Sequence, residues 1–318
     1  MTAPHPLRRP FASVAWAAVL AVTTATAQET SAPPVPAPTV PAPAVPAPTA
    51  AAAPEGETAP AATDVEALLA QMRRAHGLEE QRTFESFVGA LRFMPRGQGA
   101  DSVSVDLEVR FRQPRRIRYR FVEDGRVLER GLDRLGMWAR LNADGPPRSL
   151  GGPDFQDDRA QVKREIGLAR QLLHFLDPVA LVRAFDAPPE IGEATLPFSR
   201  GKTKKCLTIT GEVAEFPLYL AGGASHRAHL KLWVDAASYQ LTAVQCLPLG
   251  DQGRVVYPGE FLLFPKHVAW HGILLPGVLA VHRVHQGAPK EPVVDVTVLQ
   301  ADLGVELDDA AFDRDADW

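Results

Sequence analysis

This chain of 318 residues has little cysteine, no long hydrophobic run and no large excess of one charge. It has two cysteines, which excludes a fold built on disulfide bonds. No apolar run reaches the roughly 20 residues that a membrane-spanning helix needs, so we do not expect an integral membrane protein. The 34 lysines and arginines nearly balance the 38 aspartates and glutamates, which argues against nucleic acid as a partner.

The short motifs of common catalytic sites are also missing. The sequence has no Gly-x-Ser-x-Gly, no phosphate-binding loop, no Gly-x-Gly-x-x-Gly, no His-Glu-x-x-His and no Cys-x-x-Cys. His267 and His271 have a spacing that binds zinc on a helix, but on a strand it leaves them about 13 Å apart. We therefore expect no enzyme, no cofactor and no metal. A metal-dependent hydrolase using these two histidines is the remaining enzymatic alternative.

The first 27 residues are typical of a cleaved signal peptide. Arg8 and Arg9 precede a short apolar run over residues 11–22, and Ala25-Thr26-Ala27 fits the rule of small residues at a cleavage site. We expect cleavage after Ala27 and a periplasmic or otherwise exported protein.

Residues 28–62 form a linker rich in proline and alanine. Ten prolines in this stretch favour polyproline II and leave nothing to build a core. The linker is either a semi-rigid spacer or a dispensable disordered leader. Residues 63–318 remain as one domain, large enough to bury its own core.

Alternating apolar and polar residues dominate this domain and predict an antiparallel sheet. The expected strands span residues 84–93, 103–111, 116–121, 127–133, 136–141, 205–213, 227–235, 239–247, 254–264, 277–285 and 292–300. Apolar residues at helical spacing predict a helix over 64–76 and another over 157–176, and Asp177-Pro178 can begin a third. The fold class is mainly β with α: an incomplete antiparallel barrel of about eleven strands, with an N-terminal helix and a mid-chain helical lid.

One face of the expected sheet carries large apolar side chains and the other carries arginines. Val109, Phe111, Ile117, Tyr119, Phe121, Trp138, Leu232 and Val244 are expected on the apolar face. Arg110, Arg112, Arg116, Arg118 and Arg120 alternate with them, and the simplest interpretation is a solvated face. The apolar face either packs into a filled core or leaves a hollow that binds a lipid.

Cys206 and Cys246 both fall in expected strands. An even number of cysteines in an exported protein indicates a possible disulfide. A strand over 227–235 would separate them by roughly 10 Å, which is more than a disulfide tolerates. Both outcomes stay open at this point.

The order of these elements resembles the LolA-like family of periplasmic outer-membrane lipoprotein carriers and their relatives. The resemblance rests on the leading helix and on residues 87–91, 109–118, 124–125, 136–138, 232–235, 296–299 and 308–312. It implies an open barrel with a helical lid over an apolar cavity that holds acyl chains. The implied ligand is a lipid or an acylated protein, and membrane-associated proteins are further possible partners.

Within that resemblance, we predict which residues form the cavity. The walls are Phe111, Ile117, Tyr119, Phe121, Trp138 and Trp233; the lid is Leu168, Leu172, Phe175 and Leu176; the polar rim is Arg112 and Gln113. The family's well-known carriers have an arginine at the position of Gln113, where it latches the lid. Here Arg112 lies one residue earlier and faces the other way. The sequence therefore fits a tethered lipid-binding sensor as well as it fits a freely diffusing lipoprotein carrier. A protein-interaction module with a filled barrel is the alternative.

Overall fold

The computed structural model describes residues 65–78, 84–96, 104–123, 125–142, 144–197, 203–256, 258–285, 287–316 and 318. The expected signal peptide, residues 1–27, and the linker, residues 28–62, lie outside these residues. Among the residues that are described, no helix is long and apolar enough to cross a membrane.

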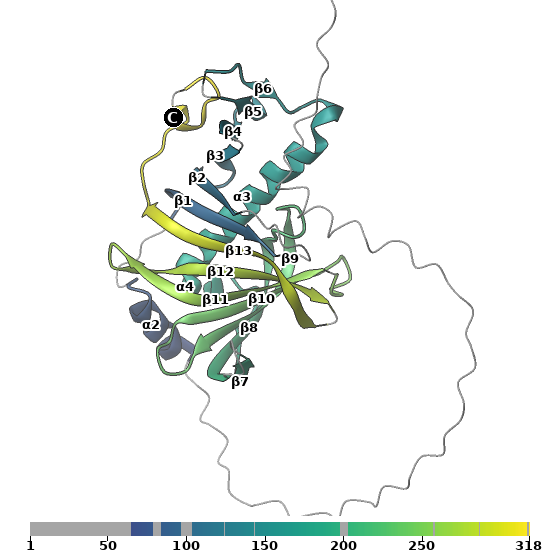
Figure 1. The fold of residues 1–318 in the computed structure, drawn as a ribbon. Helices are drawn as coiled ribbons and strands as arrows, with labels where there is room; N and C mark the ends of the chain where they lie inside the picture. Colours follow the sequence, from purple (N-terminus) through teal and green to yellow (C-terminus); the bar gives the residue numbers. More distant parts are fainter. Residues whose placement is uncertain are drawn as a thin grey trace, which may run out of the picture.

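The described residues form one antiparallel sheet of thirteen strands (Figure 1). The strands are β1 Ser86–Pro95, β2 Val105–Arg112, β3 Arg116–Glu123, β4 Arg126–Asp133, β5 Gly136–Leu141, β6 Arg148–Ser149, β7 Glu190–Pro197, β8 Thr203–Pro217, β9 Ser225–Asp235, β10 Leu241–Pro248, β11 Gly259–Trp270, β12 Ile273–His285 and β13 Ala288–Leu303. The helices are α2 Val65–Ala75, α3 Gln156–Leu176 and α4 Pro178–Arg183, with 3-10 turns η1 Pro153–Phe155 and η3 Ala310–Phe312.

The sheet is open, and its two edges are consecutive in the sequence. Its order is β6-β5-β4-β3-β2-β1-β13-β12-β11-β10-β9-β8-β7, so β6 and β7 are the edge strands. The chain passes from one edge to the other through η1, α3 and α4. Helix α3 contacts β4 near one edge, β8 near the other, and β12 in the middle. A straight helix reaches strands so far apart in the order only if the sheet curls around it, so α3 lies inside the curve.

The expected fold class is confirmed: a mainly β protein with an incomplete antiparallel barrel and a mid-chain helix. The sequence predicted about eleven strands, and the two that it missed are the edges β6 and β7. Helix α3 begins one residue before its predicted start. The next helix begins as its sequence indicates: Pro178 is the first residue of α4, and the Asp177 carboxylate accepts a hydrogen bond of 2.9 Å from the Ala180 amide.

The N-terminal helix packs its apolar stripe of Leu68, Leu69 and Met72 into the core. It ends at Ala75, and Gly77 follows with a φ of +69° that suits a glycine after a helix. Just before Gly77, His76 is buried and docks the helix on the sheet: its Nε2 accepts from the Leu241 amide at 3.1 Å, and its carbonyl accepts from the Leu274 amide at 3.0 Å.

Candidate functional site

The predicted cavity residues mostly meet inside the curve of the sheet. Phe111, Ile117, Tyr119 and Phe121 alternate along β2 and β3, and each is at most 3% exposed. The four lid residues, Leu168, Leu172, Phe175 and Leu176, are buried in the same core cluster. Near the C-terminal end of α3, Phe175 packs against Phe216 and Phe264. The interior is therefore an apolar space that α3 and these side chains fill.

The structure corrects the placement of the two tryptophans. Trp138 lies opposite Gly131, which in turn lies opposite Arg118, so Trp138 shares the face of Arg118 and not the interior. Trp233 lies between Leu232 and Val234, which are both core residues, and strand parity turns it outward. There its ring contacts Phe261 edge-on, in a smaller cluster on the outer face.

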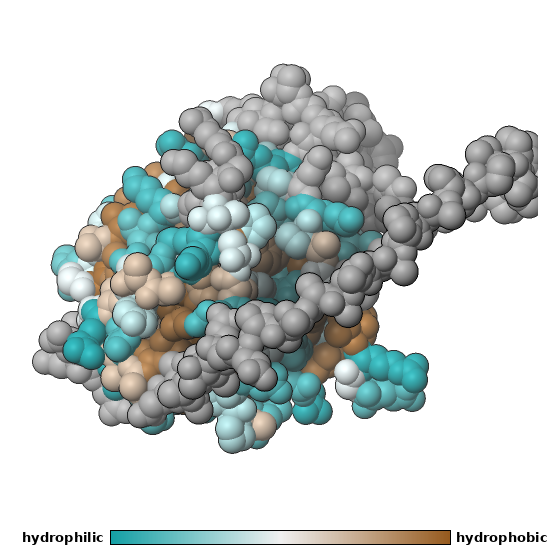
Figure 2. All heavy atoms as spheres, turned by 90° about the horizontal axis from the view of Figure 1, so that it is seen from below, coloured by the Kyte–Doolittle hydropathy of each residue, from teal (hydrophilic) through white to brown (hydrophobic). Residues whose placement is uncertain are grey.

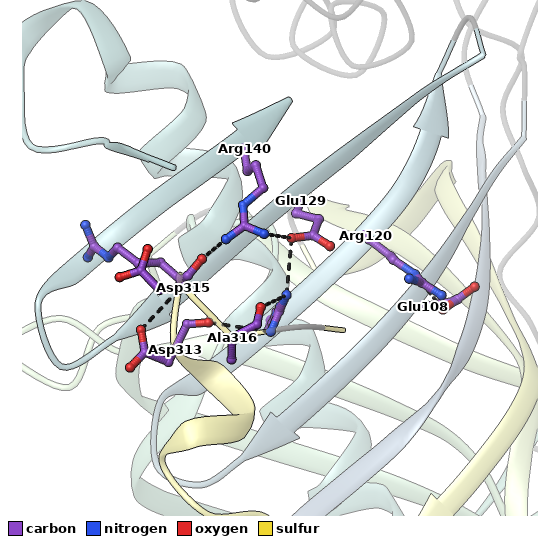
Figure 3. Close-up of polar contacts among 9 residues, drawn as sticks. Glu108, Arg120, Glu129, Arg140, Asp313, Asp315 and Ala316 are labelled. Carbon is purple, nitrogen blue, oxygen red and sulfur yellow. Dashed lines mark hydrogen bonds and ion pairs between the residues drawn. The ribbon is translucent and has the colours of Figure 1, made fainter. Parts of the chain in front are cut away.

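The sequence suggested a solvated arginine face, but the C-terminal segment, the described residues 305–316 and 318, crosses part of it (Figure 3). The other arginines of this face stay partly exposed: Arg110, Arg112, Arg116 and Arg120. Arg118 is fully buried and donates to the Ala316 carbonyl at 2.9 Å, and it forms an ion pair with Glu129 at 3.3 Å. Arg140 donates to the Arg314 carbonyl. Arg314 itself forms a two-bond ion pair with Asp133, at 2.7 and 2.8 Å.

Two aromatic side chains hold this segment, one at its middle and one at its end. Phe312 is fully buried, beneath the guanidinium of Arg112. The ring of Trp318 lies against the guanidinium groups of Arg110, Arg118 and Arg120, at 4.4 to 5.3 Å from its centre.

The predicted polar rim lies at the β2–β3 turn. Arg112 points to the outer face, as its parity predicted, and it binds Asp309 and the Leu307 carbonyl there. Gln113 is exposed, and its backbone amide donates to the Glu85 carbonyl at 2.7 Å. Neither contact involves α3.

Inside the curve, a group of polar side chains runs between α3 and the sheet. We call it the polar seam, and it consists of Tyr119, Arg130, Asp158, Gln161, Glu165 and Tyr219. Asp158, Gln161 and Glu165 recur three and four residues apart, which puts them on one face of α3. Opposite them, Tyr119 and Arg130 are direct neighbours on β3 and β4. Arg130 Nη2 joins the two sides by donating to Asp158 Oδ1 at 2.6 Å.

Burial dominates the electrostatics of the polar seam. It raises the pKa of Glu165 to about 7, although the cations of Arg164 and Arg130 oppose the shift. Burial also raises the pKa of the Tyr119 and Tyr219 hydroxyls. Arg130 lies near enough to Tyr119 to lower its pKa, although the two groups do not meet hydrogen-bond geometry.

Several polar atoms of the polar seam are buried without a partner among the described residues. They are Arg130 Nε and Nη1, Gln161 Nε2, Glu165 Oε1 and the hydroxyls of Tyr119 and Tyr219. Each costs about 1–3 kcal/mol when it is removed from water and left unpaired. The closed interior therefore carries a cost concentrated at the contact between α3 and β3–β4.

In the C-terminal half of α3, a buried polar side chain has hydrogen-bond partners. Gln171 Nε2 donates to Glu260 Oε2 at 2.6 Å and to the Pro217 carbonyl at 2.8 Å. Glu260 also accepts from the Leu220 amide, and burial raises its pKa to about 7. The loop over residues 218–224 crosses α3 so closely that a Cβ on Gly167 would lie 2.4 Å from the Gly223 Cα.

Two hollows adjoin α3 and α4. A small, partly open pocket of about 20 Å³, enough for one water, lies at the start of α3. Leu128, Ala139, Leu141, Leu150 and Phe155 line it, together with the polar residues Arg130, Arg140, Arg148 and Asp158. An open groove of about 380 Å³ lies between α2 and α4. Figure 2 views the molecule from the end where α2 and β7 lie, and hydrophobic residues are visible there between hydrophilic ones.

The possible disulfide between Cys206 and Cys246 is not formed, because both cysteines are free. Strand β9 separates them: Cys206 lies opposite Asp235, at the end of that strand, and Cys246 lies opposite Leu230, near its middle. Cys246 belongs to the main core and Cys206 to the outer cluster.

His267 and His271 lie in different surroundings. His267 contacts His76 at 6.2 Å between ring centres, whereas His271 is exposed in the β11–β12 turn, 3.5 Å from Asp302. No group of three or more His, Cys, Asp or Glu in the described part of the chain could hold a metal ion.

The polar seam is the feature that the sequence analysis missed. Its signal was present, because Asp158, Gln161 and Glu165 repeat at the same helical spacing as the apolar residues of this segment. Polar residues at such positions face the core and need partners there.

No protein-family model and no curated protein matches the chain. Solved structures do. A LolA superfamily protein from Nitrosomonas europaea is 11% identical, with a TM-score of 0.40 over 78% of this chain and 98% of that one. An outer membrane lipoprotein-sorting protein domain from Vibrio parahaemolyticus is 11% identical, with a TM-score of 0.35 over 77% and 95%. LprF from Mycobacterium bovis is 13% identical, with a TM-score of 0.25 over 79% and 96%. The open antiparallel sheet, the leading helix and the mid-chain helix described above follow the order of elements on which the resemblance in the sequence rests.

Proposed function

We propose that this protein is an exported, non-enzymatic carrier or sensor that holds an acyl chain, from a lipid or an acylated protein, inside the curve of the sheet. Phe111, Ile117, Tyr119 and Phe121 form the wall of the site. The apolar side of α3 is the lid, and the chain enters when this helix moves. The signal peptide supports export to the periplasm, and the proline-rich linker sets the reach of the domain.

One observation carries the proposal: α3 lies in the connection between the two open edges of the sheet, and it packs across the apolar interior from β4 to β8. The two edges are not hydrogen-bonded to each other, so the helix can move without breaking a pair of strands. An acyl chain gains about 0.8 kcal/mol for each CH₂ that leaves water. It would replace apolar contacts that α3 now makes.

Native mass spectrometry tests the proposal. The full chain is expressed with its signal peptide, purified from a bacterial periplasm, and extracted with organic solvent. We expect a co-purifying mass that yields fatty acyl species, and uptake of a fluorescent fatty-acid probe. A bare protein mass with no probe uptake would overturn the proposal and favour a protein-interaction module with a filled core.

A matched pair of variants locates the site. Phe121→Asp puts a charge on the inner wall and should abolish probe binding. Phe261→Asp makes the same change in the outer cluster, where Phe261 is 7% exposed, and should leave binding intact. Circular dichroism checks that both variants keep the strand content of the parent. Equal loss in both folded variants would show that the acyl chain does not lie against β3.

A further inference from the structure

The polar seam has more hydrogen-bond donors than acceptors. Arg130 Nε and Nη1 and Gln161 Nε2 are donors without a partner among the described residues. The two tyrosine hydroxyls, which can donate or accept, are also without a partner there. These side chains are at most 4% exposed, so bulk solvent does not reach them. A guanidinium has only donors, and it is satisfied by carboxylate, phosphate or carbonyl oxygens.

Few acceptors of the chain remain for these donors. Asp158 already accepts from Arg130 Nη2. Glu165 is the other carboxyl group of the polar seam, and burial raises its pKa to about 7, so near neutral pH a large fraction carries a proton. A protonated carboxyl is itself a donor and widens the imbalance.

We propose that the polar seam binds the head group of the acyl ligand, and that this head group is an acceptor-only anion, a carboxylate or a phosphate. The inference rests on the function proposed above and names the ligand class of the same site. Arg130 supplies the charge, and Tyr119 and Gln161 supply neutral donors beside it. The hydrocarbon chain then extends from this point along the apolar wall.

The small pocket at the start of α3 supports this placement. It touches Arg130 and Asp158 on its polar side, while Leu128, Ala139 and Leu141 give it an apolar wall. Charged and apolar groups thus meet at one point, as the junction of a head group and its chain requires. The pocket holds about one water in this form, so a larger head group enters only as α3 moves.

A series of ligands with one chain length and different head groups tests the inference. Dodecanoate, dodecyl phosphate, dodecanol and dodecylammonium are compared by displacement of a bound fluorescent fatty-acid analogue from the full chain. We expect the carboxylate and the phosphate to bind at least about tenfold more tightly than the alcohol, because a charge-assisted hydrogen bond adds that much. The ammonium should bind more weakly than the alcohol. Acetate and inorganic phosphate, which have no chain, should not displace the probe.

Two variants assign the preference to the polar seam. Tyr119→Phe removes only a hydroxyl that has no partner, so the protein should fold and its preference for carboxylate over alcohol should fall. Arg130→Gln combined with Asp158→Asn removes the buried ion pair as a unit, and the preference should disappear while dodecanol still binds. Arg92→Gln removes an exposed arginine that is paired with Asp106, and it should change neither value.

The outcomes separate the two proposals. If none of the four dodecyl ligands displaces the probe, or the probe itself does not bind, the acyl-binding function fails. If all four bind equally well, the function stands and the head-group inference is overturned. The inference is also overturned if the preference for anions survives in both polar-seam variants.

Discussion

Replacing Glu165 with glutamine should make the protein more stable at neutral pH, and the gain should vanish in acid. Glu165 lies on α3 in the contact between the helix and the sheet, and it is 5% exposed. Burial raises its pKa from 4.5 to about 7, more than the cations of Arg164 and Arg130 lower it. Glutamine has nearly the same shape but cannot ionise, so the substitution removes the cost of burying a charge.

The sign and the size follow from proton linkage. Between pH 4.5 and about 7, the folded state holds a proton on Glu165 that the unfolded state has lost, so the free energy of unfolding falls as the pH rises. Above pH 7 the loss is complete, and a pKa raised from 4.5 to about 7 corresponds to about 3 kcal/mol. Glu165→Gln should therefore match the parent near pH 4.5 and exceed it by up to about 3 kcal/mol at pH 8.

Urea unfolding of both proteins at several values between pH 5 and pH 8 measures this difference. The difference isolates Glu165 from other groups, including the buried His76 and the half-buried His174, whose pKa values desolvation lowers to about 4. The same substitution at Glu193, which is exposed on β7, controls for the loss of one negative charge. A stability difference that is constant across this range would refute the buried, protonated state of Glu165 and the packing of α3 described here.

Two further predictions concern packing, and a third concerns the cysteines. Phe312→Ala removes a fully buried ring under the C-terminal segment and should lower the free energy of unfolding by about 3 kcal/mol or more; a loss below about 1 kcal/mol would contradict this packing. Gly167→Ala forces a Cβ to within 2.4 Å of the Gly223 Cα, so it should destabilise the protein by about 1–3 kcal/mol and speed hydrogen exchange in α3; unchanged exchange would count against the close crossing. Unfolded under non-reducing conditions, the chain should show two reactive thiols, Cys206 and Cys246, and finding none would restore the disulfide.

Local patterns predicted the elements of this fold because local rules control them. Helix α3 follows from apolar spacing, and α4 begins where Asp177 caps it and Pro178 opens it. The alternation along 103–121 also separated the apolar face from the arginine face correctly. The missed strands, β6 and β7, are the sheet's edges, where pairing on one side leaves little pattern in the sequence.

Contacts between distant parts of the chain could not be predicted from local sequence patterns. Nothing in the arginine repeat indicates that residues 305–316 and 318, about 200 positions later, would cover part of it. The placement of the two tryptophans in the cavity wall was a different error. They were assigned by their size and aromatic character, and the alternation of side chains along a strand was not applied to them. Trp233 could not share a face with Leu232 on the same strand. For Trp138, only the register opposite Gly131 decides the face.

Both faces of strands β2–β5 are at least partly covered, but different interactions hold the two covering segments. On the outside, the C-terminal segment is held by the Arg118–Glu129 and Arg314–Asp133 ion pairs, and breaking a buried pair costs about 3–5 kcal/mol. On the inside, the polar seam leaves donors unpaired against α3, and each is a cost that opening relieves. The C-terminal segment is therefore firmly held on the outer face of strands β2–β5, whereas α3 is only weakly held on their inner face. When a ligand enters, α3 should be the element that moves, while the strands that carry Tyr119 and Phe121 stay in place.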